Sequence, residues 1–181
     1  AIYVANHVGY LDPIVVGAQR GLAVIAKGEL ESWPVIGPAC RHLGVIFVDR
    51  ADPHSGAKAL RRALVALRAG VSVLNFPEGT TTGGSKVRRF PKKLFKLCDG
   101  ADVNLCPLLI RYHSDGDVDP VPFVGDVAFG SHFWQLLGNK KIRATIEVLP
   151  QVKLDSESVG HQIRNIELAM REKLAARVLP N

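Results

Sequence analysis

Apolar residues in this sequence fall into short runs, separated by stretches in which apolar positions recur at helical spacing. Seven runs rich in Val, Ile and Leu predict β-strands at residues 2–5, 22–26, 45–48, 71–76, 104–112, 121–124 and 142–149. Helical patterns predict helices from residue 13 to about residue 21 and at residues 55–70, 91–97, 131–137 and 159–178. Several strands are apolar throughout, which is typical of strands covered on both faces. The alternation predicts an α/β fold with a central, mostly parallel sheet flanked by helices.

Length and composition fit one globular domain. The chain has 181 residues, 47% of them hydrophobic, so it can bury a substantial core, and we take residues 1–181 as a single domain. No run approaches the roughly 18 uninterrupted apolar residues of a membrane-spanning helix. The sequence starts at Ala1 without the charged lead-in of a signal peptide, and we expect it to be an internal fragment of a longer protein.

The charge balance points to a class of partner. The chain carries 23 Lys and Arg against 17 Asp and Glu, a net charge of +6. This excess favours phosphate-bearing partners, whether nucleic acid, anionic lipid or a phosphorylated small molecule. Cys40, Cys98 and Cys106 have neither the number nor the spacing of a disulfide framework or zinc site. We predict them to be small core residues in a reducing compartment.

A histidine and an aspartate follow the first predicted strand. The segment from Asn6 to Asp12 reads Asn-His-Val-Gly-Tyr-Leu-Asp, and Pro13 opens the first helix. In a continuous helix the His7 and Asp12 side chains would point about 140° apart. If the segment turns before Pro13, Asp12 can hold the Nδ1 hydrogen of His7 and leave Nε2 to take a proton from a substrate. We predict a general base made by this pair, with a simple N-cap role for Asp12 as the alternative.

Two further motifs follow other predicted strands. Phe76-Pro77-Glu78-Gly79 comes after the fourth: its glycine lets backbone N–H groups approach an anion, and Glu78 can order a polyol hydroxyl or a nearby basic side chain. Arg50 follows the third strand and is suited to a bidentate phosphate contact. A plain turn and a solvated Arg are the alternatives. Because ligands bind at the carboxyl ends of strands in open α/β sheets, we expect these motifs to meet His7 at one edge.

Taken in this order, the motifs resemble the PlsC-type glycerolipid acyltransferase family, which includes the 1-acyl-sn-glycerol-3-phosphate acyltransferases. The similarity extends over most of the chain. The family's four blocks match residues 6–12, 44–50, 76–80 and 105–110, and residues 26–30 and 33–37 are also similar. The family commonly has Arg directly after Glu-Gly-Thr, whereas Thr81 stands there in this sequence.

The resemblance implies acyl transfer from acyl-CoA or acyl-carrier protein to the free hydroxyl of a lysophospholipid. The acceptor that we expect from the resemblance is 1-acyl-sn-glycerol-3-phosphate, whose acylation would give phosphatidic acid. His7 would be the base and Asp12 its orienting partner, and no metal or other cofactor is required. The implied acceptor site consists of Lys27, Arg50, Glu78, Gly79 and Thr80, with Arg88 and Arg89 available to compensate for Thr81. Pro107 lies in the fourth block, residues 105–110, for which an acyl-binding or structural role is implied.

Membrane association is a further expectation. The resemblance implies a peripheral or monotopic protein on the cytoplasmic face, with membrane-binding helices upstream of this chain. Residues 86–96 hold six basic residues and no acid, interleaved with Phe90, Leu94 and Phe95. Basic residues attract anionic lipid while aromatic residues enter the headgroup layer, so this segment is a candidate interface. A solvated helix face is the alternative.

Other functions remain open on the sequence. Thr81 motivates a different acceptor, such as a lyso-aminolipid. A non-catalytic basic module that binds anionic membranes or nucleic acid is also possible, although neither task needs the paired His7 and Asp12. Asp115, Asp117 and Asp119 have the spacing of a calcium loop, but Pro120 stands where such a loop turns on glycine, so we predict no metal site.

Overall fold

A computed structural model describes residues 1–19, 21–33, 36–49, 51–52, 54–91, 95, 103–115, 120–125, 127–139, 141–155 and 157–176. The strands are β1 (Ile2–Ala5), β2 (Leu22–Lys27), β3 (Ile46–Val48), β4 (Ser72–Asn75), β5 (Asn104–Ser114), β6 (Ile142–Val148) and β7 (Val152–Lys153). The helices are α1 (Asp12–Gln19), α2 (Ile36–His42), α3 (Ser55–Arg68), α4 (Phe129–Leu137) and α5 (Val159–Ala175), with a 3-10 turn, η1 (Gly28–Ser32).

One sheet joins all the strands, in the order β3-β2-β4-β1-β5-β6, with β7 on the free part of β5. Strands β1 to β5 pair with one another in parallel, while β6 and β7 run antiparallel to β5. Ile2 of β1 pairs with Val73 of β4 on one side and with Leu105 of β5 on the other. The predicted mostly parallel α/β sheet is therefore confirmed, and β1 lies in its interior.

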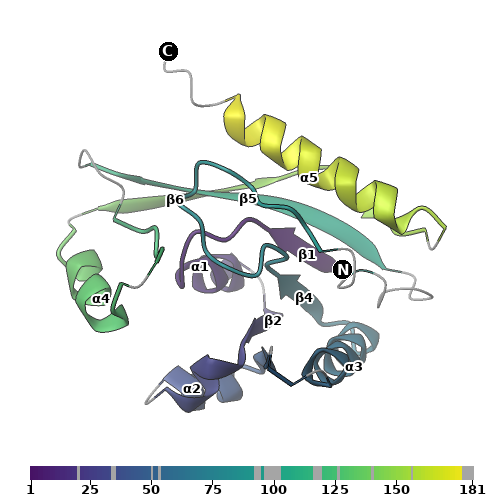
Figure 1. Ribbon diagram of the computed structural model, residues 1–181, viewed down its shortest axis with the longest axis horizontal. Coiled ribbons are helices and arrows are strands. Elements are labelled where there is room, and N and C mark those ends of the chain that lie inside the picture. Colours follow the sequence, from purple (N-terminus) through teal and green to yellow (C-terminus); the bar gives the residue numbers. More distant parts are fainter. Residues whose placement is uncertain are drawn as a thin grey trace.

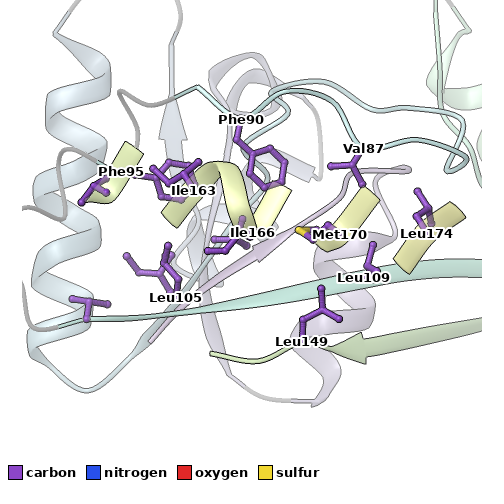
Figure 2. Packing of buried hydrophobic residues seen from close by; sticks show 14 residues of the cluster. Val87, Phe90, Phe95, Leu105, Leu109, Leu149, Ile163, Ile166, Met170 and Leu174 are labelled. Atoms are coloured by element: carbon purple, nitrogen blue, oxygen red, sulfur yellow. The ribbon is translucent and has the colours of Figure 1, made fainter. Parts of the chain in front are cut away.

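Helices cover both faces of the sheet. On one face, α5 packs its apolar stripe against β1 and β5, and Met170 in the middle of that stripe has no exposed surface (Figure 2). Helix α3 covers the same face farther along, because it packs on Val73, which is in register with Ile2. On the other face, Val16 of α1 and Leu136 of α4 share a core with β1, β4 and β5. Figure 1 shows α5 on one side of β5 and β6, and α1 with α4 on the other.

Three predicted elements differ in the structure. Residues 121–124 form no strand; they run beside the His7 loop, where the Phe123 N–H donates to the Val8 carbonyl at 3.0 Å, and this packing rather than sheet pairing buries Val121. Of the helix predicted at 91–97, only Pro91 and Phe95 are described, and neither is helical. The predicted strand 142–149 ends one residue early, at Val148.

Short elements escaped prediction because their patterns are weak. Helix α2 has Gly37 and Pro38 in its first turn, η1 is a single 3-10 turn, and β7 has only two residues, between the predicted strand 142–149 and the predicted helix 159–178. In the part of the chain that the structure describes, no helix combines the length and apolar character needed to cross a bilayer.

Candidate active site

The loop after β1 turns back on itself and brings His7 and Asp12 together. The Asp12 N–H donates to the Gly9 carbonyl at 3.1 Å, and this tight turn ends where α1 begins. The Nδ1 atom of His7 lies 2.7 Å from Oδ2 of Asp12. The contact predicted from the spacing of the two residues is confirmed, and the Asp12 carboxylate faces back toward residues 7–9 rather than capping the helix.

Three further hydrogen bonds end on the Asp12 carboxyl group. Its Oδ2 accepts from the N–H groups of Val8 at 2.7 Å and Gly9 at 3.0 Å, and its Oδ1 accepts from the Tyr112 hydroxyl at 2.8 Å. With both Asp12 oxygens acting as acceptors, the short contact with His7 fits Nδ1–H as the donor to Oδ2. In that tautomer the lone pair of the imidazole is on Nε2, which is the arrangement a general base requires.

Asp12 is fully buried, whereas the His7 side chain is 22% exposed. A buried carboxylate is costly unless each oxygen is bonded, and the four contacts to Asp12 meet that need. Asn6, also fully buried, fixes the start of the same loop: its side chain donates to the Ile110 carbonyl at 3.0 Å and accepts from the Ile110 N–H at 2.8 Å. The loop is thus anchored to β5 by Asn6 and Tyr112, at opposite ends.

The imidazole ring also has a packing partner. The ring of Phe76, at the end of β4, stacks on that of His7 with centroids 4.3 Å apart and an angle of 22° between the planes. The Thr82 N–H donates to the His7 carbonyl at 2.7 Å, which ties the loop after β4 to the loop after β1. Among the described residues, His7 Nε2 has no hydrogen-bond partner, so the ring is held by Asp12 and Phe76 with one nitrogen left for a substrate.

Glu78 lies under the same loop and beside the segment that carries Arg88. The residue is 9% exposed, and within the described ranges neither carboxyl oxygen has a hydrogen-bond partner of ordinary geometry. Burial raises the pKa of Glu78 from 4.5 to about 7; the N–H groups of His7 and Arg88 and the Arg88 charge oppose this rise, and the Asp12 charge adds to it. Both oxygens are shielded, and no ion pair or hydrogen bond joins Glu78 to a basic side chain among the described residues, so both predicted roles of Glu78 stay predictions.

The remaining predicted acceptor residues lie at the same edge but differ in their surroundings. Lys27 ends β2 and forms an exposed ion pair with Glu29 at 2.7 Å. Gly79 turns the chain after β4 with φ of 70°, a conformation that favours glycine, and its N–H donates to the Phe76 carbonyl at 3.2 Å. Thr80 is exposed at the tip of this turn. Arg50 lies outside the described residues.

Thr81, which stands where the family commonly has Arg, is used inside the protein. Its hydroxyl donates to the Phe123 carbonyl, which joins the loop after β4 to residues 121–124. The position therefore offers no cation to a ligand and holds a loop contact instead. Pro107 has a structural setting: it is buried in β5, pairs with Val4 and accepts a hydrogen bond from the Leu149 N–H at 2.9 Å.

The basic segment at residues 86–96, which was expected to meet lipid, packs part of its apolar side chains against α5 instead. Residues 87–90 form neither helix nor strand and lie against α5, with Val87 and Phe90 buried and Arg88 and Arg89 exposed. The Phe90 N–H donates to Glu167 at 2.9 Å, and the Val87 carbonyl accepts from Arg171 at 3.0 Å.

Phe95 is only 2% exposed and belongs to the same core (Figure 2). Leu94 lies outside the described residues. The prediction that aromatic side chains of this segment enter a bilayer is therefore wrong for Phe90 and Phe95, because α5 covers them.

Other candidate groups add no second site. Cys106 is buried and Cys40 is half-buried; neither forms a disulfide within the described ranges, and burial raises the pKa of Cys40. Cys98, Asp117 and Asp119 lie outside the described residues. Within the described ranges, no three His, Cys, Asp or Glu side chains cluster so as to hold a metal ion.

Several residues of the site were not predicted individually. Tyr112 comes from a strand far along the sequence, so no local pattern links it to Asp12. Phe76 and Asn6 stand inside the two recognised motifs, but their stacking and bridging roles depend on β1 lying between β4 and β5. Only the position of Phe76 and Asn6 inside these motifs could have indicated that they belong to the site.

Comparison with known proteins agrees with this geometry. Residues 1–111 match the family model described as Acyltransferase. A lyso-ornithine lipid O-acyltransferase of Pseudomonas aeruginosa is 32% identical over 182 residues, which cover 99% of this chain and 69% of that protein. A 1-acyl-sn-glycerol-3-phosphate acyltransferase of Neisseria gonorrhoeae is 28% identical over 144 residues, 79% of this chain and 56% of that protein.

A solved structure matches as well. The crystal structure of the 1-acyl-sn-glycerophosphate (LPA) acyltransferase PlsC from Thermotoga maritima superimposes with a TM-score of 0.61 at 26% identity, over 97% of this chain and 66% of that chain. The matched family model spans more than half of the chain and includes the His7 loop and the Glu78 turn. The chain belongs to the acyltransferase family.

Proposed function

We propose that this chain is the catalytic domain of an O-acyltransferase that moves a fatty acyl group to the free hydroxyl of a lysophospholipid. The observation that carries the proposal is the His7–Asp12 pair, in which Nδ1 is bound to a buried carboxylate and Nε2 is left without a partner among the described residues. A binding module has no use for a base oriented in this way. The names of the related acyltransferases support the same reaction class.

The proposed chemistry follows from the two ends of the imidazole. His7 Nε2 takes the proton of the acceptor hydroxyl as its oxygen attacks the acyl carbonyl carbon of a thioester donor. Asp12 stabilises the imidazolium that forms, since its carboxylate stays an anion held by Val8, Gly9 and Tyr112. The tetrahedral intermediate then collapses, the carbon–sulfur bond breaks, and His7 returns the proton to the leaving thiolate. The proposed donor is acyl-CoA or acyl-carrier protein, and the reaction so written uses no cofactor.

The acceptor head group divides the proposal into a first and a second candidate. Lysophosphatidate is the first, because Arg88 and Arg89 are exposed beside the Glu78 turn and can bind a phosphate. A lyso-aminolipid such as lyso-ornithine lipid is the second, because the hydroxyl of Thr81 is bonded to the Phe123 carbonyl at the position where the family commonly has a cation. A Thr81→Arg change adds a cation and should shift the preference toward the phosphate acceptor, whereas the preference of the wild-type chain decides between the two candidates.

The reaction is tested by thiol release from palmitoyl-CoA and from palmitoylated carrier protein, with a panel of lysolipids that includes both candidates. His7→Ala should lower kcat by about 10² to 10⁴-fold, the usual contribution of a positioned base. His113→Ala, which changes an exposed histidine of β5, is the matched control and should keep the wild-type rate. Full activity of a folded His7→Ala protein would refute the mechanism. Thiol release that does not depend on a lysolipid would refute the transfer.

The proposed location is the cytoplasmic face of a membrane, where a lysolipid acceptor resides. This follows from the acceptor class and from the basic charge of the chain. The surface that would meet the bilayer is a separate question, since the aromatic residues expected to do so are buried under α5.

A further inference from the structure

Helix α4 and the residues before it turn apolar side chains outward. Phe133, Trp134 and Leu137 are 36%, 72% and 58% exposed, and on a helix they fall within an arc of about 100°. Val124 and Val127, just before the helix, are 45% and 46% exposed. We call these five residues the α4 surface.

The inward side of α4 already has its packing partners. Leu136 is 6% exposed and lies in the core shared with α1 and the sheet, and His132 is equally buried. The outward apolar residues are therefore not needed to hold the helix on the domain. A helix on a water-facing surface usually carries polar residues on that side, so the α4 surface has the character of a contact surface.

The α4 surface is connected directly to the loop that carries His7. The hydroxyl of Tyr10, three residues after His7, lies 2.9 Å from His132 Nδ1, and its ring meets that of Phe129 edge-on at 5.0 Å. Phe129 in turn stacks on Phe133, with ring centroids 5.7 Å apart. A body that binds the α4 surface would therefore sit against the same end of the domain as the His7–Asp12 pair, and Figure 1 shows α4 on the α1 side of the sheet.

Charge and residue type indicate what that body is. From residue 124 to residue 146 the sequence has one acid, Asp126, against the three cations Lys140, Lys141 and Arg143 that follow the helix. A Trp and a Phe on an exposed helix face, flanked by cations, suit the boundary between lipid headgroups and acyl chains, where the rings bury apolar area and the cations meet anionic lipid. This excess of cations favours an anionic partner.

We propose that the α4 surface docks on an anionic lipid bilayer and holds the His7 loop at the level of the headgroups. The surface takes the place of residues 86–96, whose aromatic side chains face α5. The docking itself is independent of catalysis; only its benefit, access to an acceptor that lies in the bilayer, rests on the proposed function.

Vesicle binding of the 181-residue chain tests the proposal without any acyl donor. The probes are vesicles of phosphatidylcholine alone and of phosphatidylcholine mixed with phosphatidylglycerol, assayed by co-sedimentation. The double change Phe133→Ser with Trp134→Ser should weaken binding to the anionic vesicles about tenfold or more, since it removes the two largest exposed rings. The matched control is Leu43→Ser with Val65→Ser, which removes two other exposed apolar side chains, 71% and 65% exposed, elsewhere on the protein.

A fluorescence experiment identifies the surface that contacts lipid. The chain has two tryptophans, so a Trp33→Phe background leaves Trp134 as the reporter. Its emission should shift to the blue on anionic vesicles and be quenched by lipids brominated on their acyl chains. His7→Ala should bind as the wild type does, which separates this proposal from the catalytic one: vesicle binding without turnover leaves the docking surface standing.

Three results would overturn the proposal. The first is that the wild-type chain fails to bind anionic vesicles. The second is that the Phe133/Trp134 double variant binds them as tightly as the wild type. The third is that the chain binds while Trp134 emission stays unchanged, which would assign the contact to another surface. A self-association that the double variant abolishes, without vesicle binding, belongs to the first result and identifies a second copy of the chain as the partner.

Discussion

The buried carboxyl of Glu78 makes a specific contribution to how stability depends on pH. Burial raises the pKa of this group from 4.5 to about 7 in the folded chain. Below pH 4.5 Glu78 is protonated in both states; between the two values only the folded state keeps the proton, so the free energy of unfolding falls as pH rises. The difference of about 2.5 units, at about 1.36 kcal/mol per unit, gives a loss of about 3 kcal/mol between pH 4.5 and pH 7.

Glu78→Gln removes this titration and keeps the shape of the side chain. The free energy of unfolding, measured by urea denaturation from pH 4.5 to pH 8, should favour the Gln variant over the wild type by about 3 kcal/mol more at the upper end than at the lower end. Glu172→Gln, at an exposed position of α5, is the control and should differ from the wild type by less than about 0.5 kcal/mol throughout. Because the Arg88 charge opposes the rise, Arg88→Ala should extend the wild-type slope to higher pH.

Two outcomes would contradict the reasoning about Glu78. A difference between the Gln variant and the wild type that does not change with pH would mean that the carboxyl titrates alike in both states. A wild type that gains stability relative to the variant as pH rises would mean that the carboxylate, rather than the neutral acid, is the form the fold favours.

Two other predictions concern the loop that holds Asp12. Tyr112→Phe removes the hydroxyl that donates to Asp12 Oδ1, and it should lower the free energy of unfolding by about 1.5–3 kcal/mol, the usual value for a hydrogen bond to a charged group. It should also reduce kcat more than it changes KM, and an unchanged kcat in steady-state assays would show that Tyr112 does not position His7. Gly9→Ala places a Cβ 2.8 Å from the Val121 carbonyl oxygen and should lower the free energy of unfolding, measured in urea, by about 1–3 kcal/mol. Gly17→Ala, with open space around the new carbon, should be neutral or stabilising, and equal effects of the two changes would show that the His7 loop moves to accommodate the Cβ.

Local spacing made the centre of the site predictable, whereas contacts that cross the sheet were not. His7 and Asp12 are five residues apart, and a single turn brings them together. The Tyr112 hydroxyl reaches Asp12 only because β5 lies next to β1, and the sequence has no short-range signal of that pairing. The same holds for the burial of Glu78, since its position after a strand is visible in the sequence but the residues that cover it are not.

The basic segment shows where the sequence interpretation was incomplete. Interleaved cations and aromatic residues at 86–96 favoured a lipid interface, with a solvated helix face as the alternative. The structure instead buries Val87 and Phe90 against the apolar stripe of α5, and Glu167 accepts a hydrogen bond from the Phe90 N–H. Because α5 comes about 80 residues later in the sequence, no local pattern shows that it covers this segment.

The interior position of β1 has a consequence for biosynthesis. Among the strands of this sheet β1 is made first, but both of its neighbours, β4 and β5, are made much later, and Asn6 reaches its partner Ile110 across 104 residues of sequence. At about 5–20 residues per second, the apolar strand waits several seconds for the edges it needs. We expect the nascent chain to depend on chaperones during that interval, and no N-terminal fragment that ends before β5 should assemble the His7 loop.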